Sequence, residues 1–495
     1  MQSSTDMDIL IVGAGISGIN AAYRVQTETP LNYEILEARN DLGGTWSLFQ
    51  YPGIRSDSDL YSFGFPFRPW EGNQSIADGD AIYNYVKDTA EEFGINKKIR
   101  YNTEVRSAEW SSAERRWTLT LHSRESGKET TKTCKFVLFC SGYYDYQGGY
   151  QPHITGMDDY QGKWIHPQAW PKDYDYTGKK MVVIGSGATG VTLLPNLAKK
   201  AKHVTLLQRS PSYFVALSNK GGRDIWSYLL PTVVYHSLLR FFLALRSYIF
   251  YWACQGFPSI ARYILRSLTK RQLPNRLSID PHFSPNYNPW DQRVCVVPDG
   301  DMFKALRDGN ADIITGAIEH ITRNGIKLTD GSELEADVIV CATGLNMKLF
   351  GGASLIVDGE KVDTSKRFMF RGQMLTNVPN ASLCFGYVNA SWTLGSDCCA
   401  IFVCRLINEM LRKNISHVTP QPPSDLSIED SQPMTALSSG YFKRGLKILP
   451  RGAGRGVWQL KHNYFLDFAT ARGWGLAWNP FEKMDVSYGE VKKVK

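Results

Sequence analysis

Apolar and small residues recur in the same order at two places along the chain. Residues 8–12 (Asp-Ile-Leu-Ile-Val) and 180–184 (Lys-Met-Val-Val-Ile) are short runs rich in branched side chains, and a glycine-rich turn follows each. Apolar residues with helical spacing follow the first turn, over 19–26, and further apolar runs follow at 33–37 and 203–207. A strand, a tight turn, a helix and a second strand give this pattern. The sequence therefore predicts an α/β fold that contains this unit twice.

The two turns carry the glycine spacing of dinucleotide-binding folds. Residues 13–18 read GAGISG and residues 185–190 read GSGATG. The first glycine permits the sharp turn, the second lets the backbone approach a pyrophosphate, and the third lets helix and strand pack closely. Since a helix N-terminus attracts phosphates, both turns are predicted to bind nucleotides. The residues expected there are Gly13, Gly15, Ser17 and Gly18 in the first turn, and Gly185, Ser186, Gly187, Ala188, Thr189 and Gly190 in the second.

The residue after the second strand of each unit indicates which nucleotide binds. Glu37 ends the strand that follows the first turn, where a carboxylate can accept hydrogen bonds from ribose hydroxyls. Arg209 holds the corresponding position in the second unit, with Ser210 beside it. A cation there favours a 2′-phosphate, and so NADPH over NADH. The alternative is that Arg209 is only the solvated end of a strand.

Two more apolar strands indicate how the chain divides into domains. Residues 136–142 and 337–344 are apolar runs that end in small residues, and they are predicted crossing points between two domains. The fold class expected is α/β, with two Rossmann-like dinucleotide-binding domains and a helical insertion. The predicted segments are 1–145 with 346–495 for the first domain, 146–215 with 292–345 for the second, and 216–291 for the insertion.

Composition and charge exclude several classes of protein. The 495 residues are 43% hydrophobic and 21% charged, as in a packed globular protein. The net charge of +8 is spread along the chain, so no nucleic-acid partner is expected. The nine cysteines have no regular spacing, so no metal site is expected, and a reducing, cytoplasmic setting is predicted. No cysteine precedes Cys134, which excludes a disulfide reductase with a redox pair near the first turn.

The most apolar part of the chain lies between residues 225 and 265. Arg240 and Arg246 interrupt its apolar windows, so packed amphipathic helices are expected rather than a membrane span. Weak peripheral membrane contact through a basic amphipathic face is the alternative. Aromatic residues from Trp226 to Phe257, with Tyr387 and Trp392, are candidates for an apolar substrate pocket.

A motif before the second glycine-rich turn narrows the function. Residues 160–171 read YQGKWIHPQAWP, which resembles the fingerprint of Baeyer-Villiger monooxygenases, with Tyr160 in place of phenylalanine. The ending Trp170-Pro171 favours this branch over the related N- and S-oxygenating flavoenzymes. Longer strings, such as residues 43–46 (GGTW) and 288–293 (NPWDQR), resemble the bacterial ethionamide-activating monooxygenases of this family. Gly162, His166 and Trp170 are expected at the hinge between the domains, where they would couple the domains rather than carry chemistry.

The resemblance implies an FAD- and NADPH-dependent enzyme that uses O2. Through a C4a-(hydro)peroxyflavin it would convert ketones to esters or lactones and thioethers to sulfoxides. Its partners would be small apolar ketones or thioethers; the oligomeric state is not indicated. One alternative is an N- or S-oxygenating monooxygenase without ketone activity. Another is a flavoprotein that binds both nucleotides but acts as a redox sensor or as a membrane-associated partner protein.

The resemblance also implies roles for individual residues. Arg293 is the expected active-site cation, and Asp57 the acid that positions it. Gln292 stands where many members of the family have lysine, so NADPH preference would rest mainly on Arg209 and Ser210. The other residues expected to contact the cofactors are Gly44, Thr45, Trp46 and Val105 for FAD, and Arg55 and Ser56 for the nicotinamide.

Overall fold

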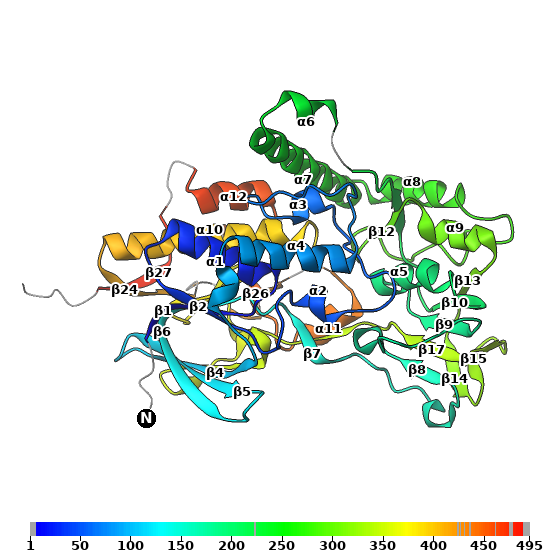
Figure 1. Ribbon diagram of the computed structural model, residues 1–495, viewed down its shortest axis with the longest axis horizontal. Coiled ribbons are helices and arrows are strands. Elements are labelled where there is room, and N and C mark those ends of the chain that lie inside the picture. The colour runs from blue at the N-terminus through cyan, green and yellow to red at the C-terminus, as the bar shows by residue number, and fades with distance from the viewer. Residues whose placement is uncertain are drawn as a thin grey trace, which may run out of the picture.

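The chain folds around two separate β-sheets (Figure 1). The structure is a computed structural model that describes residues 6–221, 224–422, 425, 427–429, 431–434, 437–460, 462–474 and 479–488. The first sheet contains the N-terminal strand, and the second contains the middle of the chain. Both sheets have a parallel strand–turn–helix unit, so the predicted α/β fold class is confirmed.

The first sheet is built on β1 (Met7–Val12). It runs parallel to β2 (Tyr33–Leu36) on one side and to β6 (Glu129–Phe139) on the other. Alternate residues of β1 face opposite layers: Ile9 and Ile11 pack with α1 (Ile16–Glu28), α4 (Gly79–Glu92) and α10 (Trp392–Arg412), whereas Leu10 and Val12 join Trp110 and Trp117. The strand order is β20-β19-β4-β5-β6-β1-β2-β3, with β23 paired to β6. The other strands are β3 (Ile99–Arg100), β4 (Thr103–Ser111), β5 (Arg116–Ser123), β19 (Ser354–Val357), β20 (Glu360–Lys361) and β23 (Ala381–Leu383).

The second sheet is entirely parallel and has the order β13-β10-β9-β17-β8. Helices α5 (Ala188–Leu197) and α9 (Asp301–Asp308) pack against it, and the three-stranded antiparallel sheet β14-β15-β16 lies next to it (Figure 1). The strands are β8 (Lys163–Ile165), β9 (Lys180–Ile184), β10 (His203–Gln208), β13 (Ala311–Thr315), β14 (Ile318–Thr322), β15 (Gly325–Leu328), β16 (Glu333–Glu335) and β17 (Val338–Cys341).

Two short strands connect the halves of the molecule. β7 (Tyr144–Gly149) leads from the first sheet to the second, and β18 (Leu345–Met347) returns antiparallel to it. His166 lies against this crossing: its Nε2 is 3.2 Å from the carbonyl oxygen of Gly344, and a Cβ on Gly149 would lie 1.8 Å from its ring. Burial lowers the pKa of His166, which keeps the ring neutral. His166 therefore holds the two crossing strands together.

The segment predicted as a helical insertion, 216–291, contains three helices, with α6 (Ile225–Leu229) and α7 (Thr232–Gly256) at the top of Figure 1 and α8 (Pro258–Lys270) at its upper right. By length and composition α7 could cross a bilayer, and 17% of its most apolar window is buried. The two arginines therefore do not exclude a membrane span on composition alone, contrary to the sequence argument. The structure adds that Arg240 is buried and donates from Nη1 to the carbonyl oxygen of Gly64, at 2.5 Å. This bond fastens α7 to the first domain.

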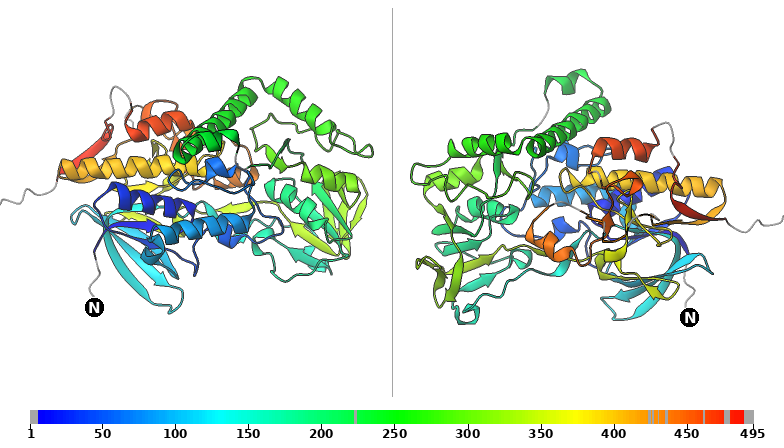
Figure 2. Two further views of the ribbon diagram at one scale, coloured as in Figure 1. Left: turned by 45° about the horizontal axis from the view of Figure 1, so that its top comes forward. Right: turned by 180° about the vertical axis from the view of Figure 1, so that it is seen from behind.

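The C-terminal segment returns to the first domain. α10 packs beside α1, and α12 packs on α10 in turn (Figure 2). The remaining α-helices and strands are α2 (Thr45–Leu48), α3 (Leu60–Phe63), α11 (Gly440–Gly445), α12 (Tyr464–Arg472), β11 (Phe214–Leu217), β12 (Cys295–Pro298), β21 (Met369–Phe370), β22 (Met374–Leu375), β24 (Ile415–Pro420), β25 (Gln432–Pro433), β26 (Arg451–Gly452) and β27 (Met484–Tyr488).

Candidate active site

A cleft of about 580 Å³ lies between the two glycine-rich turns. It is lined by both halves of the molecule, from the carboxyl ends of β1 and β6 to the N-terminus of α5. A crevice at the carboxyl ends of parallel strands is the usual ligand site of such folds. The predicted residues that line it are Gly13, Gly15, Ser17, Glu37, Gly44, Thr45, Trp46, Arg55, Ser56, Asp57, Val105, Ala188, Thr189 and Arg293.

The other predicted residues lie outside the cleft wall. Gly18 and Gly190 face inward in their turns, where an added Cβ would lie 1.9 Å from the Gly13 oxygen and 2.0 Å from the Gly185 oxygen. Arg209 and Ser210 are exposed just beyond the end of β10. The residues that do not line the cleft are Gly18, Gly162, His166, Trp170, Gly185, Ser186, Gly187, Gly190, Arg209 and Ser210.

The first turn is preorganised by its own hydrogen bonds. The buried Glu37 carboxylate accepts from the backbone N–H of Ala14 at 2.8 Å and of Arg39 at 2.9 Å. Burial raises the pKa of Glu37, and these two bonds oppose that shift. The Ser17 hydroxyl accepts from the Trp392 indole at 2.8 Å, which connects the turn to α10. The carboxylate thus fixes the turn as well as facing the cleft.

The second turn is tied to the strand end that carries the predicted phosphate-binding residues. The Ser186 hydroxyl donates to the carbonyl oxygen of Ser210 at 3.0 Å. The Ser212 hydroxyl donates to the Ser186 carbonyl oxygen at 2.9 Å. These bonds hold the segment after Arg209 against the turn, and Arg209 itself remains exposed to solvent.

The loop 51–57 reaches across from the first domain to the second. A Cβ on Gly53 would lie 2.0 Å from Nδ2 of Asn196 on α5, so the loop backbone packs directly on that helix. Arg55 forms an ion pair with Asp301, the first residue of α9. The side chain of Arg55 is therefore already engaged between the domains, and the loop delivers Asp57 to the cleft.

Arg293 and Asp57 face each other in the cleft. Nη1 of Arg293 lies 3.9 Å from Oδ2 of Asp57. Burial disfavours the charged Arg293, whereas the neighbouring Asp57 carboxylate favours it, and the pKa of Arg293 is raised. Burial raises the pKa of Asp57, while Arg293 and Arg55 lower it. Nε of Arg293 is buried and has no hydrogen-bond partner among the described residues. The cleft thus contains a fixed cation with unused donor capacity.

The insertion holds the turn that carries Arg293. Trp290 has a positive φ of 72° and packs edge-on against Tyr251 of α7, with ring centroids 5.5 Å apart. Arg262 of α8 donates to Oδ1 of Asn288 at 2.7 Å. On the other side, the backbone N–H of Ser438 donates to the Asp291 carbonyl oxygen at 2.8 Å. Arg293 is therefore positioned by contacts from the insertion and from the C-terminal segment.

Several residues of the cleft were not predicted from the sequence. Tyr143 and Tyr144 adjoin Arg293, with their hydroxyl oxygens 3.1 Å apart, and Lys348 pairs with Asp145 at 2.8 Å. For Tyr143, Tyr144 and Asp145 the signal was their place shortly after β6, because residues that follow a parallel strand line the crevice at its carboxyl end. The aromatic residues of 226–257 do not line the cleft, whereas Tyr387 and Trp392 do.

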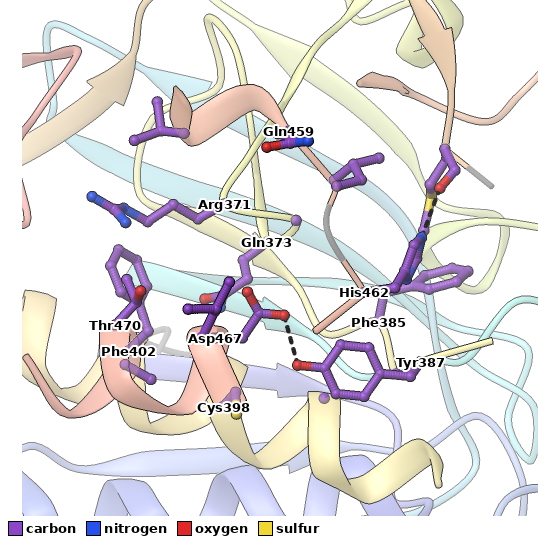
Figure 3. A pocket seen from close by; sticks show the side chains of 18 of the residues that line it. Arg371, Gln373, Phe385, Tyr387, Cys398, Phe402, Gln459, His462, Asp467 and Thr470 are labelled. Carbon is purple, nitrogen blue, oxygen red and sulfur yellow. Dashed lines mark hydrogen bonds between the residues drawn. The ribbon is translucent and has the colours of Figure 1, made fainter. Parts of the chain in front are cut away.

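A smaller cavity of about 110 Å³ adjoins the cleft behind Tyr387 (Figure 3). Tyr387 lines both cavities, and its hydroxyl donates to Oδ2 of Asp467 on α12 at 2.7 Å. Arg371 and Gln373 lie on the far side of this cavity. Tyr387 is thus the partition between the two spaces.

The residues present fit an FAD and an NADP molecule. Gly15 and Gly44 face each other, with 3.6 Å from a Cβ on Gly15 to the Gly44 Cα, and nothing lies within 4 Å of a Cβ on Gly187. The second glycine of each turn, Gly15 or Gly187, therefore leaves room for a pyrophosphate at the N-terminus of the following helix. The buried Ser141 hydroxyl in the cleft has no partner among the described residues.

Comparison with known proteins places the chain in a family. The sequence profile of the flavin-binding monooxygenase-like family matches residues 6–389. The chain is 47% identical to the FAD-containing monooxygenase EthA of Mycobacterium tuberculosis, over 94% of this chain and 95% of that protein. It is 41% identical to the probable FAD-binding monooxygenase AlmA of Acinetobacter baylyi, over 93% of each.

Solved structures share the fold. An oxidized steroid monooxygenase bound to NADP matches with a TM-score of 0.77 at 19% identity, covering 98% of this chain and 100% of that one. A cyclohexanone monooxygenase bound to ε-caprolactone matches with a TM-score of 0.73 at 18% identity, covering 97% and 100%. These structures confirm the predicted fold, and the family match together with the EthA relative confirms the predicted class of flavin-dependent monooxygenase. The chain belongs to the flavin-binding monooxygenase-like family.

Proposed function

We propose that this protein is a Baeyer-Villiger monooxygenase that converts small apolar ketones to esters or lactones and also oxidises thioethers to sulfoxides. Each turnover would consume one O2, one NADPH and one proton. One oxygen atom enters the substrate, the other leaves as water, and NADP+ is released. The observation that carries the proposal is the Arg293–Asp57 pair, which lies in a cleft shared by both nucleotide turns. A fixed cation is what nucleophilic oxidation of a carbonyl requires, because negative charge develops on its oxygen.

The remaining residues of the site have binding and positioning roles in this proposal. Bound FAD, reduced by NADPH, would supply the activation of O2. The first turn, with Glu37, Thr45, Trp46 and Val105, would hold FAD, and the second turn would hold NADPH. Asp57 would orient the Arg293 guanidinium and balance its charge. Arg55 and Ser56 would help to hold the nicotinamide, on a loop that the Arg55–Asp301 ion pair joins to α9.

Product analysis tests the reaction. The FAD-loaded protein is incubated with NADPH, O2 and either phenylacetone or methyl phenyl sulfide, and products are identified by mass. Ester from the ketone supports the proposal. Sulfoxide without ester would favour an N- or S-oxygenating monooxygenase. NADPH oxidation that neither substrate stimulates would contradict both the Baeyer-Villiger function and this alternative.

The preference for NADPH is expected to depend on Arg209. Arg209→Glu should raise the KM for NADPH about tenfold or more and leave the KM for NADH nearly unchanged, because it replaces a cation at the 2′-phosphate position by an anion. Arg323→Glu, in an exposed turn of the same domain, changes the net charge equally and is the control. Equal effects of the two variants on the KM for NADPH would rule out a specific role for Arg209.

The packing of Trp290 on the insertion is expected to matter for turnover. Trp290→Ala should lower kcat about tenfold, because loss of its contacts with Tyr251 and Phe250 lets the turn that carries Arg293 shift. The KM for NADPH should stay within twofold, and Trp290→Phe should restore most of kcat (about twofold below wild type). Steady-state kinetics with the ketone measures both. A rise in the KM for NADPH with unchanged kcat would contradict this positioning role.

A further inference from the structure

The insertion presents an unusually apolar surface. Most of the large apolar side chains that are exposed in the described part of the chain belong to α6, α7 and α8. Val234, Leu238, Phe242, Ile249 and Trp252 follow one another along α7 at spacings close to helical turns, so they form one stripe. The exposed apolar residues of the other two helices are Ile225, Trp226, Tyr228, Leu229, Ile260, Tyr263, Ile264 and Leu268.

The charges of residues 225–279 all have one sign. Asp224 and Asp280 flank this stretch, and Asp280 pairs with Arg266 of α8. No aspartate or glutamate occurs between residues 225 and 279, whereas arginine and lysine recur. The first of them, Arg240, is buried against Gly64, but Arg246, Lys270 and Arg271 are exposed. An apolar stripe beside exposed cations suits the interface of an anionic bilayer, where apolar side chains enter the acyl region and cations meet phosphates. Tryptophan and tyrosine are enriched at the interface between a bilayer and water, so the exposed tryptophan and tyrosine side chains of these helices fit the same location.

We propose that α6, α7 and α8 form a docking surface that binds this enzyme to membranes containing anionic phospholipids. All three helices stand on one side of the molecule, with α6 and α7 projecting at the top of Figure 1 and α8 continuing along its upper right edge. The exposed fractions are large for apolar residues: 58% for Trp252, 59% for Phe242 and 75% for Tyr263. A contiguous exposed apolar surface of this kind marks an interaction site in a folded protein.

The helices lie on the bilayer surface rather than spanning it. Arg240 sits near the middle of α7 and its guanidinium is bonded to the first domain. Phe241 also packs against Phe465 of α12, with ring centroids 5.4 Å apart, and Tyr251 packs against Trp290. A spanning α7 would have to break these contacts and place both Arg240 and Arg246 in hydrocarbon, which is costly. Docking flat keeps the contacts and buries only the exposed stripe.

The charge pattern also decides between a bilayer and a second copy of the chain. In a two-fold dimer the same surface meets itself, so exposed cations such as Arg246 and Lys270 would face one another without acidic partners from residues 225–279. Like charges held together across an interface are unfavourable. Anionic lipid supplies the missing opposite charge.

The docking surface adjoins the active site. The contact of Trp290 with Tyr251 connects α7 to the turn of Arg293, and Ala244 of α7 packs in one cluster with Tyr387, which lines the cleft. An apolar substrate dissolved in the bilayer would thus be near the cleft of a docked enzyme. The inference of membrane docking does not depend on which reaction the cleft performs.

Vesicle sedimentation tests the docking surface. The FAD-loaded full-length protein is mixed with vesicles of phosphatidylglycerol and phosphatidylethanolamine, and separately with phosphatidylcholine vesicles. Wild type should sediment with the anionic vesicles and much less with the neutral ones. Phe242→Ser/Trp252→Ser should lower the partition coefficient about tenfold or more on both, since the variant loses apolar anchors. Lys270→Glu/Arg271→Glu should remove most of the preference for anionic vesicles.

Controls separate docking from folding and from dimer formation. Tyr488→Ser removes a residue that is 64% exposed on β27, far from the insertion, and should sediment as wild type does. Flavin absorbance and NADPH oxidation without vesicles should be unchanged in every variant. Unaltered vesicle binding by Phe242→Ser/Trp252→Ser would overturn the proposal. A dimer in light scattering that this variant dissociates, with no vesicle binding by wild type, would show instead that a second copy covers the surface.

Discussion

Arg293→Ala is expected to lower kcat for ketone oxidation about 100-fold or more. A preorganised donor that stabilises developing negative charge typically contributes ~2.7 to 4 kcal/mol, and the Arg293 guanidinium lies in the cleft that both turns line. FAD content should be unchanged, because Arg293 belongs to neither glycine-rich turn. The measurement is ester formation from phenylacetone, with flavin reduction by NADPH followed separately by rapid mixing.

Two further variants distinguish charge from positioning at this site. Arg293→Lys keeps the charge but lacks the planar fork, so kcat should lie between those of wild type and Arg293→Ala. Asp57→Asn should lower kcat about tenfold, because Arg293 loses the carboxylate that orients it at 3.9 Å. Sulfoxide formation should fall less than ester formation in Arg293→Ala, since a thioether develops no oxyanion. A normal rate of ester formation in Arg293→Ala would remove Arg293 from the proposed mechanism.

The sequence predicted the parts of the site that follow from local backbone requirements. Gly13 and Gly185 have φ of 105° and 115°, which few residues other than glycine adopt, so the two turns are visible in the sequence. Glu37 and Arg209 follow from counting along a unit of fixed geometry. Arg293 and Asp57 could be named through the family resemblance alone, because nothing in their local sequence shows that the fold brings them together.

Contacts between distant segments could not be predicted. Arg55 pairs with Asp301, and the Trp290 ring rests on Tyr251, yet each pair joins residues whose separation has no periodic relation. The exposure of the apolar side chains of the insertion could not be predicted for a similar reason. Apolar helical spacing in 225–265 is the same whether the stripe faces a protein core or a lipid surface, and only the packing of α7 shows which stripe is left uncovered. Tertiary geometry, not propensity, decides these features.

Alanine in place of the second glycine of each turn gives a matched pair of variants. One is expected to weaken the binding of FAD and the other the binding of NADPH. Gly15 and Gly187 are the N-caps of α1 and α5, with nearly identical backbone angles (φ −75°, ψ −176° and φ −74°, ψ −178°). Neither angle excludes alanine, and a Cβ would meet no protein atom closer than 3.6 Å at Gly15 and none within 4 Å at Gly187. The protein itself thus has room for either methyl group. A pyrophosphate approaching the backbone does not.

Gly15→Ala should therefore lower the affinity for FAD about tenfold or more (about 1.4 kcal/mol per factor of ten) while the FAD-free protein unfolds at nearly the same temperature. Gly187→Ala should keep FAD and raise the KM for NADPH by a similar factor. FAD content is measured from absorbance after desalting, and the KM from NADPH oxidation. Because the two substitutions are chemically identical and sterically equivalent in the protein alone, a shared loss of stability would point to a folding role for both glycines. A swap of the two phenotypes would reverse the assignment of FAD to the first turn and NADPH to the second.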